Sequence, residues 1–110
     1  MAVDERLATR VRAILRNVPG VEERRMFGGL AFMVDGHMAC GVLGTDLVLR
    51  LGEQGATAAL ERPHVRPMDF TGRPIRSMVF VAPAGVDSAR ALRRWVDRAI
   101  NHAQTLPPKH

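Results

Sequence analysis

The first part of the chain carries apolar residues at helical spacing. Intervals of four and three residues separate Val3, Leu7, Val11, Ile14 and Val18. Such a stripe is typical of a helix that buries one face. Acidic residues open the segment and arginines close it, an order that complements the helix dipole. The pattern predicts an amphipathic helix that ends at Pro19-Gly20.

Four short segments that could form strands follow, separated by turn residues. They span residues 22–27, 30–34, 37–43 and 46–51. Asp35-Gly36, between the second and the third, indicates a hairpin, because a type I′ turn requires positive φ at both central positions. Along the fourth segment, leucines alternate with Val48 and Arg50, which is the period of a strand. The segments predict a four-stranded antiparallel meander.

The second half of the chain predicts a mixture of elements. We expect a short helix at 53–61, a proline-containing extended loop or irregular edge at 62–74, a strand at 78–82 and a helix that starts at Asp87 or Ser88 and ends at Gln104. The fold class is therefore α+β, with an antiparallel sheet of about five strands flanked by N- and C-terminal helices. The length of 110 residues fits one domain, residues 1–105, with a flexible tail at 106–110.

The hairpin register gives the sheet two apolar faces. With a two-residue loop, the facing pairs are Val34–His37, Met33–Met38, Phe32–Ala39, Ala31–Cys40 and Leu30–Gly41. Helices can cover one face, and the other must meet the short helix, the proline-rich segment or a second protein chain. Because an uncovered apolar patch commonly marks an interface, we expect self-association as a homodimer. The face expected to carry it consists of Ala31, Met33, Met38, Cys40 and Val42.

Arginine dominates the charge of the chain. The net charge is +5, and Lys109 is the only lysine. Arginine suits planar contacts to carboxylate or phosphate, although net charge alone favours a solvated arginine-rich surface, because it bears on solubility rather than on a site. A rim that binds phosphate or carboxylate, or nucleic acid directly, would be formed by Arg24, Arg25, Arg62, Arg66, Arg73 and Arg76. The five aromatic residues lie largely at predicted core positions, which leaves few for stacking on bases.

The chain offers little catalytic or metal-binding chemistry. His37 and Cys40 are an odd number of residues apart on one strand, so they point to opposite faces. The other histidines, in a loop, a helix and the tail, are His64, His102 and His110. Neither serine lies in a G-x-S-x-G elbow, and the glycines match no nucleotide-binding loop. We expect no metal, no cofactor and no enzymatic activity. An enzyme or small-molecule-binding domain with a pocket near Arg25, Asp69 and Arg73 is the less favoured alternative.

The cellular location follows from what the sequence lacks. A single cysteine, Cys40, cannot form an internal disulfide, which favours a reducing compartment. Charged residues at positions 4–6 interrupt any signal peptide, and no apolar run approaches the ~18 residues of a membrane span. We expect a cytoplasmic protein that does not contact the membrane.

Two segments resemble the N-terminal domain of the TfoX/Sxy family. The first runs from residue 24 to 36, and its motif residues are Arg24, Arg25, Met26, Phe27, Gly28, Gly29, Asp35 and Gly36. The second runs from residue 66 to 74, with Arg66, Pro67, Asp69, Gly72, Arg73 and Pro74. A purely structural interpretation of the first block has Arg25 paired with an acid, Phe27 in the core and the glycines in a bulge.

The resemblance implies both a fold and a role. The fold is a compact α/β domain whose antiparallel sheet is flanked by helices. The role is regulation of natural competence, because named members co-activate transcription alongside the cyclic-AMP receptor protein and are regulators rather than enzymes. It thus implies a protein partner in the transcription machinery. Full-length members carry a second, helical C-terminal domain, and this chain ends before one would begin.

Overall fold

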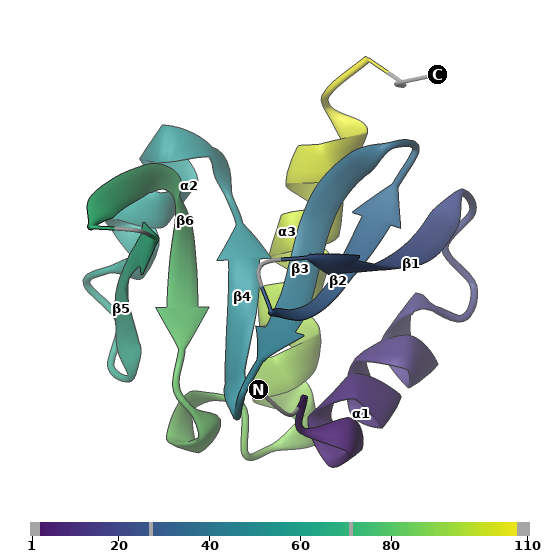
Figure 1. The fold of residues 1–110 in the computed structure, drawn as a ribbon, viewed down its shortest axis with the longest axis horizontal. Coiled ribbons are helices and arrows are strands. Elements are labelled where there is room, and N and C mark those ends of the chain that lie inside the picture. Colours follow the sequence, from purple (N-terminus) through teal and green to yellow (C-terminus); the bar gives the residue numbers. More distant parts are fainter. Residues whose placement is uncertain (1–2, 27, 71, 108–110) are drawn as a thin grey trace.

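An antiparallel sheet, six-stranded over the described residues, forms the centre of the computed structural model, with helices against one of its faces (Figure 1). The structure describes residues 3–26, 28–70 and 72–107, without the side chains of Phe70, Arg73 and Pro74. In chain order the elements are α1 (Glu5–Leu15), β1 (Val21–Met26), β2 (Gly29–Val34), β3 (His37–Leu43), β4 (Asp46–Arg50), α2 (Gly52–Ala59), β5 (Val65–Phe70), β6 (Arg73–Val81), the 3₁₀ turn η1 (Pro83–Gly85) and α3 (Ala89–Gln104). The strand order is β1-β2-β3-β4-β6-β5. The predicted α+β class and the flanking helices are confirmed.

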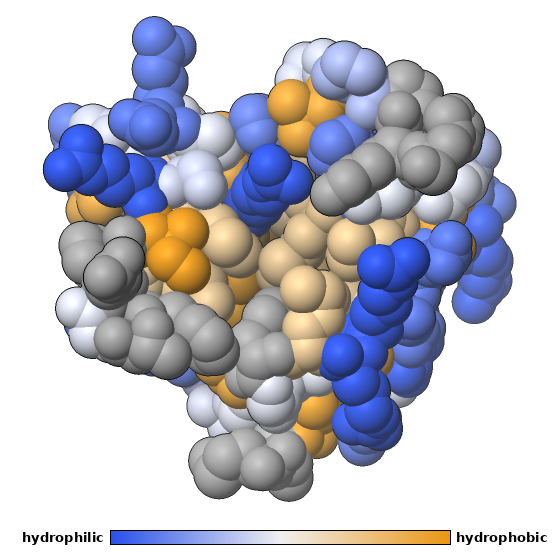
Figure 2. Space-filling view, turned by 45° about the horizontal axis from the view of Figure 1, so that its top comes forward, coloured by the Kyte–Doolittle hydropathy of each residue, from blue (hydrophilic) through white to orange (hydrophobic). Residues whose placement is uncertain are grey.

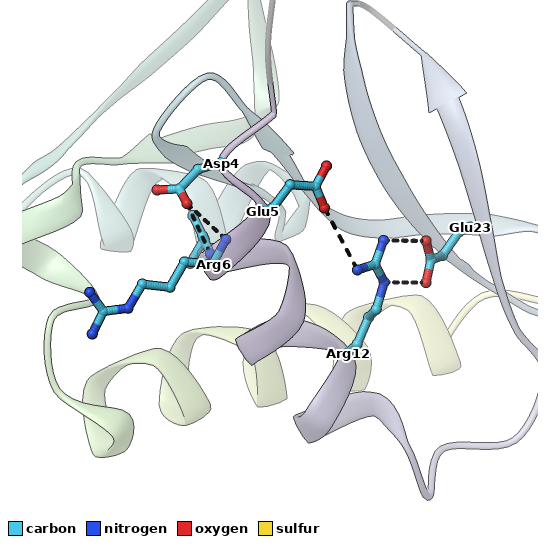
Figure 3. A network of polar contacts seen from close by, with 6 residues as sticks. Asp4, Glu5, Arg6, Arg12 and Glu23 are labelled. Atoms are coloured by element: carbon cyan, nitrogen blue, oxygen red, sulfur yellow. Dashed lines mark hydrogen bonds and ion pairs between the residues drawn. The ribbon is translucent and has the colours of Figure 1, made fainter.

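A capping residue starts α1, and an ion pair links it to the sheet (Figure 3). The Asp4 carboxylate accepts hydrogen bonds from the backbone N–H groups of Arg6 and Leu7, at 3.0 and 3.2 Å, which satisfies donors that a helix start leaves unpaired. Further along, Arg12 donates two hydrogen bonds to the Glu23 carboxylate on β1, at 2.7 and 2.9 Å. The hydrogen bond from Arg12 holds the pKa of Glu23 below its usual range. This pair ties the first helix to an edge strand.

The meander closes through the turn that the sequence predicts. Asp35 and Gly36 have φ values of 51° and 86°, as a type I′ turn requires. The backbone N–H of Asp35 also donates to the carbonyl of Gly20, at 3.1 Å. A side chain at Gly20 would collide with the Asp35 carboxylate, so this glycine allows the β1 entry and the β2–β3 turn to approach closely.

The predicted one-to-one register of β2 and β3 is correct near the turn and wrong beyond it. Val34 faces His37 and Met33 faces Met38, but Phe32 then faces Cys40 rather than Ala39. The two pairs further along are Ala31–Gly41 and Leu30–Val42. Ala39 is the extra residue of a β-bulge, which shifts every later β3 side chain to the other face.

The proline-rich segment contributes a strand that the sequence only suggests as an irregular edge. β5 pairs with β6 from Val65 to Phe70, with a register shift between Pro67 and Met68. A proline is tolerated there because β5 lies at the edge of the sheet, where a missing N–H breaks no inner ladder. β6 also begins at Arg73, earlier than the predicted residue 78. The sheet therefore has six strands over the described residues instead of about five.

The main core lies between the sheet and its helices. α3 begins at its cap Ser88, whose hydroxyl accepts from the Ala91 N–H at 3.0 Å, and it ends at Gln104 as predicted. Its buried stripe includes Leu92, Val96 and Ala99. These side chains share one cluster with residues of β2, β3, β4 and β6, and with α1 and α2. Among the residues that the structure describes, no helix residue belongs to the second buried cluster, which lies on the opposite face of the sheet.

Candidate functional site

The face of the sheet turned away from the helices carries most of the chain's methionines. Its buried residues are Ala31, Met33, Met38, Val48 and Met68, and its partly buried ones are Leu43, Ile75, Met78 and Phe80. Met26 joins them, because the β1 residues Glu22 and Arg24 face Met33 and Ala31 and strand residues alternate. We call these ten residues the methionine face. It holds five of the six methionines of the chain.

The curvature of the sheet closes much of the methionine face within a single copy. In Figure 1, β1 crosses in front of the inner strands, and β5 and β6 curl at the other side. Met68, on β5, is only 2% exposed. In Figure 2, apolar side chains gather over the middle of the molecule between hydrophilic ones. Three residues of the face remain accessible: Met26, which is 39% exposed on the edge strand β1, and Met78 and Phe80, which are half-buried on β6. We call these three residues the border of the face.

Arginines stand beside this apolar border. The Arg66 guanidinium lies over the Phe80 ring, 4.6 Å from its centroid, and bonds the Asp46 carboxylate at 2.6 Å. The two contacts hold the Arg66 side chain in place next to the face. At the other edge of the sheet, Arg24 is exposed. The methionine face thus has an arginine on each of two sides: Arg66 is ion-paired with Asp46, and Arg24 has no ion pair within the described residues.

Two residues predicted for the apolar interaction face lie on the wrong side of the sheet for it. Cys40 and Val42 are fully buried in the core beneath the helices, because the bulge at Ala39 reverses their direction. Burial raises the pKa of the Cys40 thiol to about 12, so at neutral pH it is a protonated, inaccessible group. The predicted members Ala31, Met33 and Met38 do lie on the methionine face.

The first motif block splits between the two faces and a turn. Arg25 faces Leu30 on the helix side, opposite in direction to Arg24, and it forms no ion pair with the described residues. Gly28, with φ of 77°, and Gly29 belong to the β1–β2 hairpin and not to a bulge. Phe27 lies outside the described residues. The glycines of this block therefore serve the chain reversal.

The second motif block forms the β5–β6 hairpin. Asp69 is exposed on β5, and Gly72 takes a φ of 77° in the turn. Arg73 and Pro74 pair through their backbones with Phe70 and Asp69, and their side chains lie outside the described part of the structure. β5 and β1 are opposite edges of the sheet, so the pocket predicted around Arg25, Asp69 and Arg73 draws on strands that are not neighbours.

The predicted arginine rim is likewise divided. Arg24 and Arg66 flank the methionine face from opposite edges, and Arg76 is exposed on β6. Arg62 lies elsewhere, in a pocket that it shares with Arg94 and Arg98 of α3. The sequence signal for this pocket was the spacing of four residues between the two α3 arginines, but nothing local shows that the α2–β5 connection reaches them.

Neither a metal-ligand cluster nor a membrane-spanning helix occurs among the described residues. Across residues 3–26, 28–70 and 72–107, no three or more histidine, cysteine or acidic side chains come together as metal ligands would. None of the helices in that part of the chain combines the length and apolar character that a membrane crossing requires.

Comparison with known proteins gives one result. The family model described as the TfoX N-terminal domain matches residues 13–103, which is most of the 110-residue chain. The match spans every strand of the sheet and nearly all of α3. No curated protein sequence matches the chain closely enough to count as a relative.

Proposed function

Because the chain belongs to the TfoX N-terminal domain family, we propose that it is a non-enzymatic protein-interaction module of transcription regulation. The methionine face is its docking surface. The observation that carries this proposal is the gathering of five methionines on one curved face whose border stays accessible. The family likeness implies regulation of natural competence. We propose that this chain takes that role in complex with its protein partner.

Methionine chemistry favours docking over mere packing. The side chain is unbranched and polarisable, so it adapts its shape to a partner at little cost. A core built for a unique arrangement uses branched residues, as the helix-side cluster does with its leucines and valines. The two faces of this sheet differ in this respect. Met33, Met38 and Met68 are buried, so a partner would contact the accessible methionines, Met26 and Met78.

Charge identifies the chemistry of the partner. The chain carries a net charge of +5, and Arg24 and Arg66 stand at the two edges of the methionine face. Since Arg66 already bonds Asp46, an apolar protein segment with a carboxylate opposite Arg24 would match both the face and its unpaired arginine. Such complementarity speeds encounter and fixes orientation more than it adds affinity. We therefore propose an acidic-apolar segment of a protein of the transcription machinery as the partner.

Two residues of equal exposure test the proposal. Met26, on the methionine face, is 39% exposed, and Leu60, at the end of α2, is 40% exposed. The partner is the protein that the wild type captures from lysate of its source cells and that binds the wild type again after purification. A Met26→Glu variant should no longer bind this protein. Leu60→Glu should retain it. Retention by both variants, or loss by both, would contradict docking at the methionine face.

Self-association through the same face is measured separately. A second copy offers the same apolar border, and we propose a homodimer at micromolar concentration. Sedimentation velocity should show a dimer for the wild type and for Leu60→Glu, and a monomer for Met26→Glu. A monomer in all three cases excludes the dimer.

A second candidate function, direct binding of nucleic acid, rests on a different surface. α3 exposes Arg90, Arg93, Arg94 and Arg98. Binding of a labelled duplex through these residues should weaken steeply between about 50 and 200 mM salt, because phosphate contacts release counterions. Each arginine should then contribute similarly, so Arg90→Gln and Arg94→Gln should weaken binding to the same degree. No binding at low salt removes this candidate.

A further inference from the structure

A small pocket lies where the α2–β5 connection, η1 and α3 meet, away from the methionine face. Its volume is about 200 Å³. The lining side chains that matter here are Arg62 and His64 from the connection, and Arg94, Trp95 and Arg98 from α3. None of these three elements contributes a residue to the methionine face. The pocket is therefore separate from the proposed docking surface.

The ionisable side chains that line this pocket are all basic. They are three arginines and one histidine, and the five other lining residues are uncharged. Among the described residues, ion pairs within 4.0 Å involve Arg12, Arg66 and Arg93, and none involves Arg62, Arg94 or Arg98. Three like charges around one hollow repel each other, and a bound anion would relieve that repulsion.

The walls of the pocket are held in place. The Arg98 guanidinium lies over the Trp95 ring, 5.0 Å from its centroid, and Trp95 is only 8% exposed. On the opposite wall, His64 has a φ of 68°, which non-glycine residues rarely adopt, and its carbonyl accepts from the Ala82 N–H at 2.8 Å. A Cβ added at Gly85 would lie 3.0 Å from the His64 Cβ, so the glycine permits this close approach.

The size and the donors select the ligand class. Pockets for drug-sized molecules have volumes of roughly 300–1,000 Å³, so this smaller pocket takes one compact anionic group and little of its carrier. Guanidinium forks match the oxygens of phosphate in paired, charge-assisted hydrogen bonds. We propose that the pocket of Arg62, Arg94 and Arg98 binds the phosphate group of a small phosphate monoester. The ligand is a soluble molecule and not a nucleic acid strand.

The chain contains its own probe for this binding. Trp95 is the only tryptophan, and there is no tyrosine, so the intrinsic ultraviolet fluorescence of the chain comes from a ring in the pocket wall. Inorganic phosphate and glycerol phosphate, titrated at constant ionic strength against chloride, should change this fluorescence saturably. Equilibrium dialysis with radiolabelled phosphate counts the bound anion directly and decides the case if the fluorescence is silent.

Matched arginine variants locate the site. Arg94→Gln and Arg62→Gln each remove one charge-assisted contact and should weaken phosphate binding about tenfold or more. Arg90→Gln removes the same charge from the same helix as Arg94 but outside the pocket, and it should bind as the wild type does. A melting curve for each variant confirms that it is folded.

Three results would overturn the proposal. One is dialysis that shows no bound phosphate. Another is equal weakening by Arg90→Gln and Arg94→Gln, which would indicate diffuse attraction to the helix. The last is competition by a duplex oligonucleotide that binds with higher affinity than the monoesters and displaces them. This result would show that Arg62, Arg94 and Arg98 bind nucleic acid instead. Since the methionine face takes no part, none of these results bears on the protein-docking proposal.

Discussion

Truncation of Met68 tests whether the curved sheet really closes over the methionine face. Met68 lies on the edge strand β5 and is 2% exposed, although no helix covers it. Among the described residues, the buried cluster that contains Met68 is made of strand residues, so its burial depends on the curl of the strands. If the curl persists in solution, Met68→Ala removes a buried side chain and leaves a cavity behind.

The cost of this truncation follows from burial. Replacing a buried methionine by alanine costs about 2–5 kcal/mol, because lost transfer free energy and the residual cavity add. β5 is paired on one side only, so it can relax toward the gap. We expect the lower part of the range, about 2–3 kcal/mol, which lowers Tm by about 8–24 °C for a domain of this size. Met26→Ala, at the exposed border, should cost less than about 0.5 kcal/mol.

Urea unfolding followed by Trp95 fluorescence and by circular dichroism gives the free energies of unfolding. The control is Leu49→Ala on the helix side, where Leu49 is fully buried; it should cost about 2–5 kcal/mol. The reasoning is refuted if Met68→Ala costs no more than Met26→Ala while Leu49→Ala is strongly destabilising. The methionine face would then be open in solution, and its strands would not curl as described.

Three further predictions concern single residues. Burial raises the pKa of the Cys40 thiol to about 12, so between pH 9 and 12 this thiol ionises in the unfolded chain but not in the folded one. The free energy of unfolding should therefore fall by about 1.4 kcal/mol per pH unit in this range. Urea titrations should show this slope in the wild type and its loss in Cys40→Ala. Gly52 has a φ of 76°, and a Cβ there would lie 2.7 Å from His102, so Gly52→Ala should destabilise by about 1–3 kcal/mol in the same assay. Arg12→Ala should cost only about 0–1 kcal/mol, since both partners of the pair with Glu23 are solvent-exposed; a loss above 2 kcal/mol would show that the pair anchors α1 more strongly than surface ion pairs do.

Local chemistry made part of the fold predictable. The Asp35-Gly36 turn was visible because few residue pairs accept positive φ at both positions, and α3 was visible because its apolar period and its Ser88 cap agree. The bulge at Ala39 was not visible. Whether one strand holds an extra residue depends on the twist and packing of the neighbouring strands. A register without the bulge assigns Cys40 and Val42 to the methionine face, whereas both lie on the helix side.

The candidate sites were predictable to different degrees. Alternation along the strands placed Met33 and Met38 together on one face, but Met68 and Phe80 joined them only through the pairing of β5 with β6 and of β6 with β4. Prolines in the β5 segment concealed that strand, because an edge position tolerates what an inner strand does not. The arginine pocket depends on contact between residue 62 and α3, which is a long-range feature that no local pattern reports.

Docking at the methionine face is tested most directly by the affinity of the purified partner for two variants, Met26→Glu and Leu60→Glu. The two substitutions introduce the same charge at positions of nearly equal exposure, so solubility and net charge are matched. Our account predicts a loss of at least tenfold in affinity for Met26→Glu and no loss for Leu60→Glu. Equal affinities would show that the partner docks elsewhere and that the methionines only pack.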